Sequence, residues 1–153
     1  MARSYRHQAF IEAPLDEVWE VVSDPRTHED WWPEVEGIVA GKGLGEGDEY
    51  LYKSKVLPFR DAVESVWVVE RMEELKEVHF RCTMSGTYAR FTLTPAQGHT
   101  FVEAESGMEP TALRWRVLGA LGRSYFRSWV IQVLDALPAR CRREVRSPDL
   151  QGM

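Results

Sequence analysis

The residues of this chain that could hold a metal ion are few and far apart. It contains four histidines, His7, His28, His79 and His99. No two of them have the spacing of metal ligands, so no metal site is predicted. His28, Glu29 and Asp30 form a polar run, but the side chains of sequence neighbours do not converge easily. We therefore expect this run to lie on the solvated surface.

Cysteine chemistry is not indicated either. Cys82 and Cys141 are too few for a disulfide framework and are expected to be free thiols. Cys82 lies among apolar neighbours in an alternating segment, which favours an inert core thiol. There is no Gly-x-Ser-x-Gly nucleophile motif, and the glycine-rich stretch 41–48 lacks the lysine of a phosphate-binding loop. The sequence thus identifies no catalytic residue and no cofactor.

Arginine and tyrosine offer the remaining chemistry. An arginine in an apolar pocket can bind a carboxylate or stabilise an enolate. Arg81 and Arg90 alternate with phenylalanines and are expected to face solvent. Arg71 shares strand parity with the tryptophan four residues before it, so we expect it to point inward; the alternative is a surface ion pair with the acidic turn that follows. Tyr52 and Tyr125 are candidate hydrogen-bond donors to a ligand, or core residues with satisfied hydroxyls.

An antiparallel sheet and a long helix must position these side chains. From about Val35 to Glu109, polar and apolar residues alternate in one segment after another, separated by turns, which predicts a meander of strands. Before it, Tyr5–Ala13 predicts a first strand. Two short helices are predicted after that strand, at Pro14–Val22 and Arg26–Trp31.

The residues from Thr111 to Glu144 predict one long helix with a wide apolar arc. Pro138 is expected to kink or end its regular part, and residues 147–153 are expected to form a disordered tail. So wide an apolar face must be buried, and a curved sheet offers the surface. The predicted fold is therefore a single α+β domain over residues 1–146, with a pocket between sheet and helix.

Two motifs carry a resemblance to a known family. They are A-P-L-D-E-V-W-E-V-V-S-D at residues 13–24 and W-P-E-V at residues 32–35. Together with the order of elements, they resemble the START-like (SRPBCC) superfamily, and within it the polyketide cyclase/dehydrase family. The resemblance implies a helix-grip fold, in which a curved antiparallel sheet wraps around the C-terminal helix and encloses a ligand cavity. It also implies that Trp32 lies at the pocket wall, and that Trp67 and Arg71 match an aromatic residue and an arginine of the cyclase pocket.

Two functions follow from such a cavity. The favoured one is binding of a hydrophobic small molecule, such as a lipid, quinone or polyketide-like compound. The alternative is an enzyme of the polyketide cyclase, dehydratase or aromatase type that acts in the same cavity. A third reading, an interaction module, rests on Ile131 in the polar strip of the long helix. The expected ligand-binding residues are Trp32, Tyr52, Trp67, Arg71, Phe80, Cys82, Met84, Phe91, Tyr125 and Trp129.

Charge and composition limit the possible functions and the location of the protein further. The net charge of −5 argues against nucleic-acid binding. Residues 111–146 carry eight arginines against two acidic residues; pairing of this basic helix with acidic strands is favoured over contact with a membrane surface. The first residues contain no apolar h-region, so no signal peptide is expected, and no apolar stretch is long enough to span a membrane. A cytoplasmic protein is expected, as a monomer or a homodimer.

Overall fold

Alternating side chains build an antiparallel sheet. A computed structural model of the chain describes residues 4–41, 43, 45–55, 61–108 and 123–151. Seven strands lie within these residues: β1 (Ser4–Ile11), β2 (Val35–Gly41), β3 (Glu49–Ser54), β4 (Val63–Glu73), β5 (Glu77–Cys82), β6 (Thr87–Ala96) and β7 (His99–Met108). Their order in the sheet is β1-β7-β6-β5-β4-β3-β2, so β2 to β7 form a meander and β1 closes on β7.

Short helical segments connect β1 to β2. They are α1 (Leu15–Val22), η1 (Pro25–Thr27) and α2 (His28–Trp31). Acidic side chains in the first turn of α1, Asp16 and Glu17, suit the positive end of its dipole. Asp24 caps η1, because its carboxylate accepts a hydrogen bond from the backbone nitrogen of Arg26 at 2.9 Å. The two short helices predicted after the first strand are thus confirmed, the second as η1 followed by α2.

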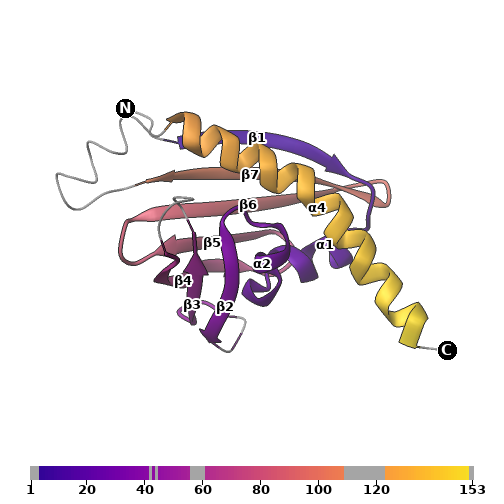
Figure 1. Cartoon of the computed structure of the whole chain (residues 1–153). Helices are drawn as coiled ribbons and strands as arrows, with labels where there is room; N and C mark the ends of the chain where they lie inside the picture. Colours follow the sequence, from indigo (N-terminus) through magenta and orange to yellow (C-terminus); the bar gives the residue numbers. More distant parts are fainter. Residues whose placement is uncertain (1–3, 42, 44, 56–60, 109–122, 152–153) are drawn as a thin grey trace.

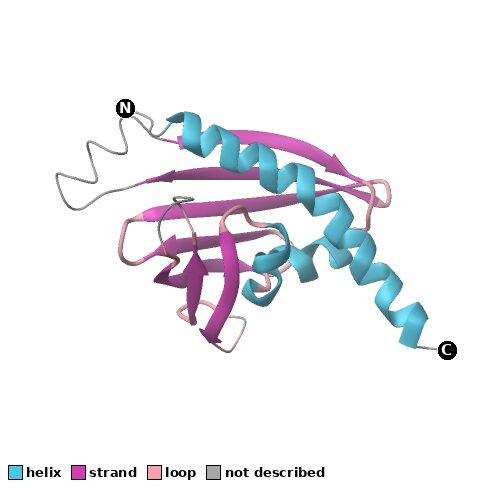
Figure 2. Ribbon diagram, in the orientation of Figure 1, coloured by secondary structure: helices cyan, strands magenta, loops and turns pink. Residues whose placement is uncertain are grey.

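A long helix, α4 (Arg123–Gln151), lies across one face of the sheet over β1 and β7 and also contacts α1 and α2 (Figures 1 and 2). The side chains that it buries recur every three or four positions, as one face of a helix requires: Phe126, Trp129, Val130, Val133, Leu134, Leu137 and Cys141. The predicted class, a curved antiparallel sheet against a long C-terminal helix, is confirmed.

Of the two alternatives expected at Pro138, a kink or an end of the helix, the structure excludes the end. Helix α4 continues to Gln151 and so extends into the segment 147–153. A proline inside a helix costs about 3 kcal/mol. Here the buried side chains of Leu137 and Cys141 flank it and hold α4 against the rest of the core. The predicted helix start at Thr111 falls within residues 109–122, outside the described part.

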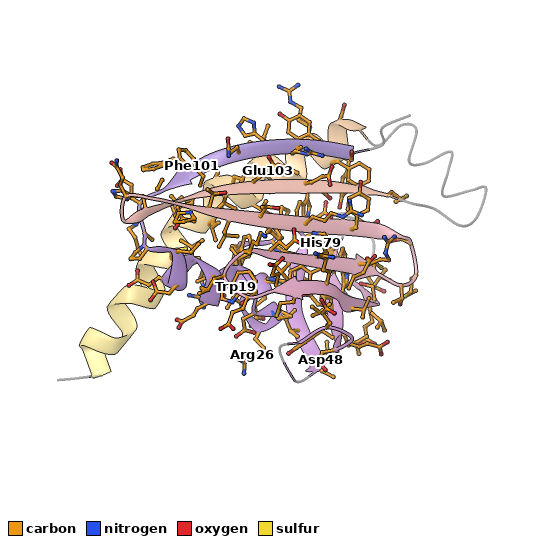
Figure 3. The ribbon with its side chains drawn as sticks, turned by 180° about the vertical axis from the view of Figure 1, so that it is seen from behind. Trp19, Arg26, Asp48, His79, Phe101 and Glu103 are labelled. Atoms are coloured by element: carbon orange, nitrogen blue, oxygen red, sulfur yellow. The ribbon has the colours of Figure 1, made fainter. Side chains whose placement is uncertain are left out.

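The other face of the sheet is charged and faces away from α4 (Figure 3). His79 and Glu103 stand on it among ion pairs that join neighbouring strands. The pairs are Arg6–Glu103, Arg6–Glu105, Arg71–Glu77, Arg81–Glu70 and Arg90–Glu105. Arg81 and Arg90 therefore lie on the outer face, as their alternation with Phe80 and Phe91 predicts.

Candidate functional site

Eight aromatic rings meet between the sheet and α4, and we call them the ring cluster. Its members are His28, Trp31, Trp32, Tyr52, Trp67, Phe80, Phe91 and Trp129. Trp32 stands at its centre: its ring stacks on His28 with centroids 3.9 Å apart, and it lies 5.1–6.2 Å from the other six. Most of these contacts are edge-to-face or tilted, the arrangements that aromatic rings prefer.

The local sequence explains why Trp32 turns inward. Helix α2 ends at Trp31, and the backbone of Trp32 is extended. Pro33 follows it, and a residue before proline is biased away from the helical conformation. The chain then turns at Glu34, which has a positive φ of 70°. This break lets the indole of Trp32 leave the helix direction and enter the space under α4.

His28 lies inside the ring cluster, which contradicts the expected surface position of His28, Glu29 and Asp30. It is fully buried, whereas Glu29 and Asp30 are exposed. The reason is helical spacing: His28 and Trp31 stand at positions i and i+3, so they share one side of α2, and Trp32 follows at the end of the helix. That spacing was the signal in the sequence that could have identified His28.

His28 and Tyr52 form the polar centre of the cluster. The Nδ1 atom of His28 lies 2.6 Å from the hydroxyl of Tyr52, and Nε2 lies 3.4 Å from the carbonyl of Val22. Burial lowers the pKa of His28 to about 3, so its ring is neutral, and burial raises the pKa of Tyr52 well above its ordinary value. Because a carbonyl only accepts, Nε2 carries the proton, and the Tyr52 hydroxyl donates to Nδ1.

Five further residues of the predicted ligand-binding set also lie in this interior. Trp32, Phe80, Cys82, Phe91 and Trp129 are buried, and all but Cys82 belong to the ring cluster. Trp67 is only partly buried, so the cluster reaches the surface at this ring. Strand alternation on β4, β5 and β6 predicts that Trp67, Phe80, Cys82 and Phe91 face the same side of the sheet, and the structure places them there.

Arg71 does not point into the interior. Its side chain is exposed on the outer face, where it pairs with Glu77 and, more distantly, with Glu73. The cause is a β-bulge: Val69 pairs with Phe80, but the next pair along the ladder is Arg71 with His79. The extra residue shifts the alternation by one, so Arg71 faces away from Trp67. The surface ion pair, the alternative interpretation of Arg71, is the observed one.

Met84 and Tyr125 also leave the predicted interior. Strand β5 ends at Cys82, so Met84 lies in the following turn, where alternation no longer applies, and it is 59% exposed. Tyr125 is 41% exposed because the buried stripe of α4 is centred one residue further on, at Phe126. Its hydroxyl donates to a carboxylate oxygen of Glu34 at 2.7 Å. This bond ties the first turns of α4 to the loop after α2.

A cavity of about 620 Å³ lies apart from the ring cluster. It lies where the end of β1 and the start of α1 meet α4, and it is lined by Phe10, Ile11, Glu12, Ala13, Pro14, Glu17, Pro138, Cys141 and Arg142. No member of the ring cluster lines it. Its walls mix apolar side chains with acidic and basic ones, so it differs in chemistry from the aromatic interior.

Metal-ion chemistry has no candidate site within the residues that the structure describes. No group of three histidine, cysteine or acidic side chains there is arranged to hold an ion. In the same residues, no helix is long and apolar enough to cross a membrane.

Comparisons with known proteins agree with this architecture. The model of the family "Polyketide cyclase / dehydrase and lipid transport" matches residues 2–142. No curated protein matches the sequence.

Among solved structures, a START superfamily protein from Mycobacterium smegmatis has a TM-score of 0.72 at 15% identity, over 92% of this chain and 97% of that one. The ZhuI aromatase/cyclase from Streptomyces sp. R1128 has a TM-score of 0.70 at 16% identity, over 95% and 96%. One half of the di-domain aromatase/cyclase StfQ of the steffimycin pathway is also similar, with a TM-score of 0.70 at 12% identity, over 93% of this chain and 51% of that one. At such identities these likenesses concern the fold alone. The family model, by contrast, spans nearly the whole sequence, and the chain belongs to the polyketide cyclase/dehydrase and lipid transport family.

Proposed function

We propose that this protein binds a hydrophobic small molecule, a lipid, quinone or polyketide-like compound, against the ring cluster between the sheet and α4. The observation that carries the proposal is the cluster itself. Seven of its eight rings are buried, and the eighth, Trp67, is partly exposed. A ligand that enters at Trp67 would meet aromatic faces and edges contributed by α2, α4 and four strands.

The chemistry of the cluster favours an apolar, flat or chain-like ligand. Aromatic rings provide large apolar contact areas and specific stacking geometries. Ligand sites are typically apolar with a few polar groups that fix orientation, and the His28–Tyr52 pair supplies polar atoms within the cluster. The family description includes lipid transport, which is compatible with a carrier.

Native mass spectrometry of the purified protein tests this proposal directly. We expect a co-purified lipid, quinone or polyketide-like molecule. As a second readout, four of the six tryptophans belong to the ring cluster, so titration with methyl oleate, menadione or an anthraquinone should shift the tryptophan emission. A protein that carries no ligand and shows no shift with any of the three would contradict the proposal.

An enzyme of the cyclase or aromatase type is the second candidate. The observation that favours it is the buried, hydrogen-bonded His28–Tyr52 pair, because proton transfer needs positioned titratable groups inside the site. Two of the similar structures are aromatase/cyclases. The test is conversion of a synthetic poly-β-ketone to aromatic product, followed by chromatography and mass spectrometry.

The variant His28→Asn separates the two candidates. Asparagine keeps an acceptor near the Tyr52 hydroxyl but cannot titrate. An enzyme should lose roughly 10²-fold or more in turnover. A carrier should yield no product even as the wild type, so the substitution should affect only its affinity for the ligand.

The location, the oligomeric state and the partners of this protein are proposed from its sequence alone. We propose a cytoplasmic protein, monomeric or homodimeric, with a small hydrophobic ligand as its partner rather than nucleic acid. Membrane contact is the less favoured alternative. Analytical ultracentrifugation, and cosedimentation with anionic vesicles, would check the oligomeric state and the membrane contact.

A further inference from the structure

The cavity beside β1 and α1 has no part in the proposed function. Its volume is about 620 Å³, and it lies where the end of β1 and the start of α1 meet α4, apart from the ring cluster (Figure 1). Sites for small molecules typically have volumes of about 300–1,000 Å³. The cavity is therefore large enough to hold a molecule of its own.

Part of its wall is apolar and already fixed. Ile11, Ala13 and Cys141 line the cavity and are buried. The backbone nitrogen of Ala13 donates to the carbonyl of Ile11, and the hydroxyl of Thr100 donates to the carbonyl of Ala13, both at 2.9 Å. The lining also contains two prolines, whose rings fix φ. A ligand would thus meet a wall that it does not have to order, which lowers the cost of binding.

The charged residues of the lining indicate the kind of ligand. They are Glu12, Glu17 and Arg142. Within the part of the chain that the structure describes, neither glutamate forms an ion pair. Burial raises the pKa of Glu17, and the charges of Asp16 and Glu20 act in the same direction. A positive group beside Glu17 would relieve this repulsion.

The balance of charge at the cavity is negative. Four carboxylates lie in the lining or act on Glu17. Against them stand Arg142 and the N-terminus of α1, whose dipole is equivalent to about half of an elementary charge. The described surroundings of the cavity therefore attract a cation and repel an anion.

We propose that this cavity is a second binding site and that it takes a small hydrophobic amine. The apolar body of the amine packs against the buried wall, and its protonated nitrogen lies beside Glu12 and Glu17. The site is separate from the ring cluster in place and in chemistry, so the inference goes beyond the proposed function and does not depend on it.

Three adamantane derivatives test the charge preference by isothermal titration calorimetry at neutral pH: 1-adamantylamine, 1-adamantanol and adamantane-1-carboxylate. They share one compact, non-aromatic cage and differ in charge. An ion pair with a partly exposed carboxylate contributes up to about 5-fold in affinity. With two such carboxylates, we expect the amine to bind about 10-fold more tightly than the alcohol, and the carboxylate to bind most weakly.

Charge-neutralising variants then locate the site. Glu17→Gln keeps the shape of the side chain and should weaken binding of the amine by up to about 5-fold, with little effect on the alcohol. Glu64→Gln makes the same change in net charge at an exposed position of β4, outside the lining, and should leave both affinities unchanged. Circular dichroism checks that both variants are folded.

A measurement on the wild type avoids dependence on any variant. In a ¹H–¹⁵N spectrum, the backbone amides of Ala13 and Cys141 should move with the amine, whereas the indole resonances of the ring cluster should not. Equal affinities of amine and alcohol, tightest binding of the carboxylate, movement of the indoles instead, or no binding of any derivative would overturn the proposal. All these outcomes leave the proposed function standing, because menadione and the anthraquinone test the ring cluster separately.

Discussion

At the scale of single residues, His28 is the position where burial and ionisation conflict most. Its ring is fully buried, stacks on Trp32 and accepts a hydrogen bond from Tyr52. Protonation would place a positive charge in an aromatic interior and would break that hydrogen bond. The folded protein therefore keeps His28 neutral, so its stability should depend on pH.

We predict that His28 makes the protein sensitive to acid. Its pKa is lowered from 6.5 to about 3 in the folded state, so the unfolded state binds the extra proton between these values. The stability contribution is complete above pH 6.5 and is lost as the pH falls towards 3. Between pH 7 and pH 5 this loss is about 2 kcal/mol.

Urea unfolding at both pH values, in the wild type and in His28→Asn, measures this contribution. The variant serves as the control, because all other titrating groups are common to the two proteins. We expect the wild type to lose about 2 kcal/mol more than the variant. Equal losses in the two proteins would show that His28 does not titrate abnormally.

The residue scale also shows what a sequence can and cannot reveal about a site. Phe80 and Phe91 were placed correctly because they lie in the middle of regular strands, where alternation is reliable. Arg71 was placed wrongly because one bulged residue on β4 reverses the alternation beyond it. His28 was missed because its exposed neighbours, Glu29 and Asp30, conceal the spacing that it shares with Trp31.

At the scale of elements, α4 is held to the rest of the domain by more than its apolar stripe. Arg140 donates to Asp30 of α2 at 2.9 Å, and Tyr125 donates to Glu34 at 2.7 Å. Arg140 thus pairs with an acid of the short helix α2, whereas the favoured interpretation of the charge on the long helix was pairing with acidic strands. The two contacts lie about four turns apart along the helix.

We predict that the Tyr125–Glu34 bond sets the ionisation of Glu34. Burial raises the pKa of Glu34, and the hydrogen bond from Tyr125 opposes that rise. Tyr125→Phe should therefore raise the pKa of Glu34 further. Carboxyl ¹³C chemical shifts of Glu34, followed through a pH titration of the wild type and the variant, would measure the change. An unchanged or lower pKa of Glu34 in the variant would contradict the contact.

Pro138 provides a second prediction at this scale. Helix α4 continues through this proline, which cannot donate the backbone hydrogen bond that its position calls for. Replacement by alanine restores the donor and removes the clash with the preceding turn. We expect Pro138→Ala to raise the free energy of unfolding by up to about 3 kcal/mol. A destabilised variant would show that the proline ring, which lines the cavity beside β1, contributes more through packing.

At the scale of the whole molecule, the fold could be predicted because it depends on patterns that many residues share. Strand alternation over β3 to β7 and the wide apolar arc of α4 are averages over many positions, so a bulge or a shifted helix face does not disturb them. The ring cluster is different, because it needs side chains from α2, α4 and four strands to converge. A convergence of that kind depends on the twist and register of the sheet, which no single segment encodes.

The last prediction concerns opening of the whole domain. Cys82 is 4% exposed on β5, opposite Trp67 of β4. Its thiol can react with a bulky reagent only when the sheet or α4 opens. In a Cys141→Ala variant, which leaves Cys82 as the single cysteine, labelling by an aromatic disulfide should be slow and should accelerate with denaturant.

A ligand on the ring cluster should slow this labelling, because it binds the closed state alone. At 100 times its dissociation constant, a ligand stabilises that state by about 2.7 kcal/mol, which is roughly a 100-fold decrease in the open population. The reciprocal variant, Cys82→Ala, reports on Cys141 beside the other cavity. If the ligand protects Cys82 and Cys141 equally, it stabilises the domain as one cooperative unit. Protection of Cys141 alone would place the ligand in the cavity between β1 and α4, and would contradict the ring cluster as its site.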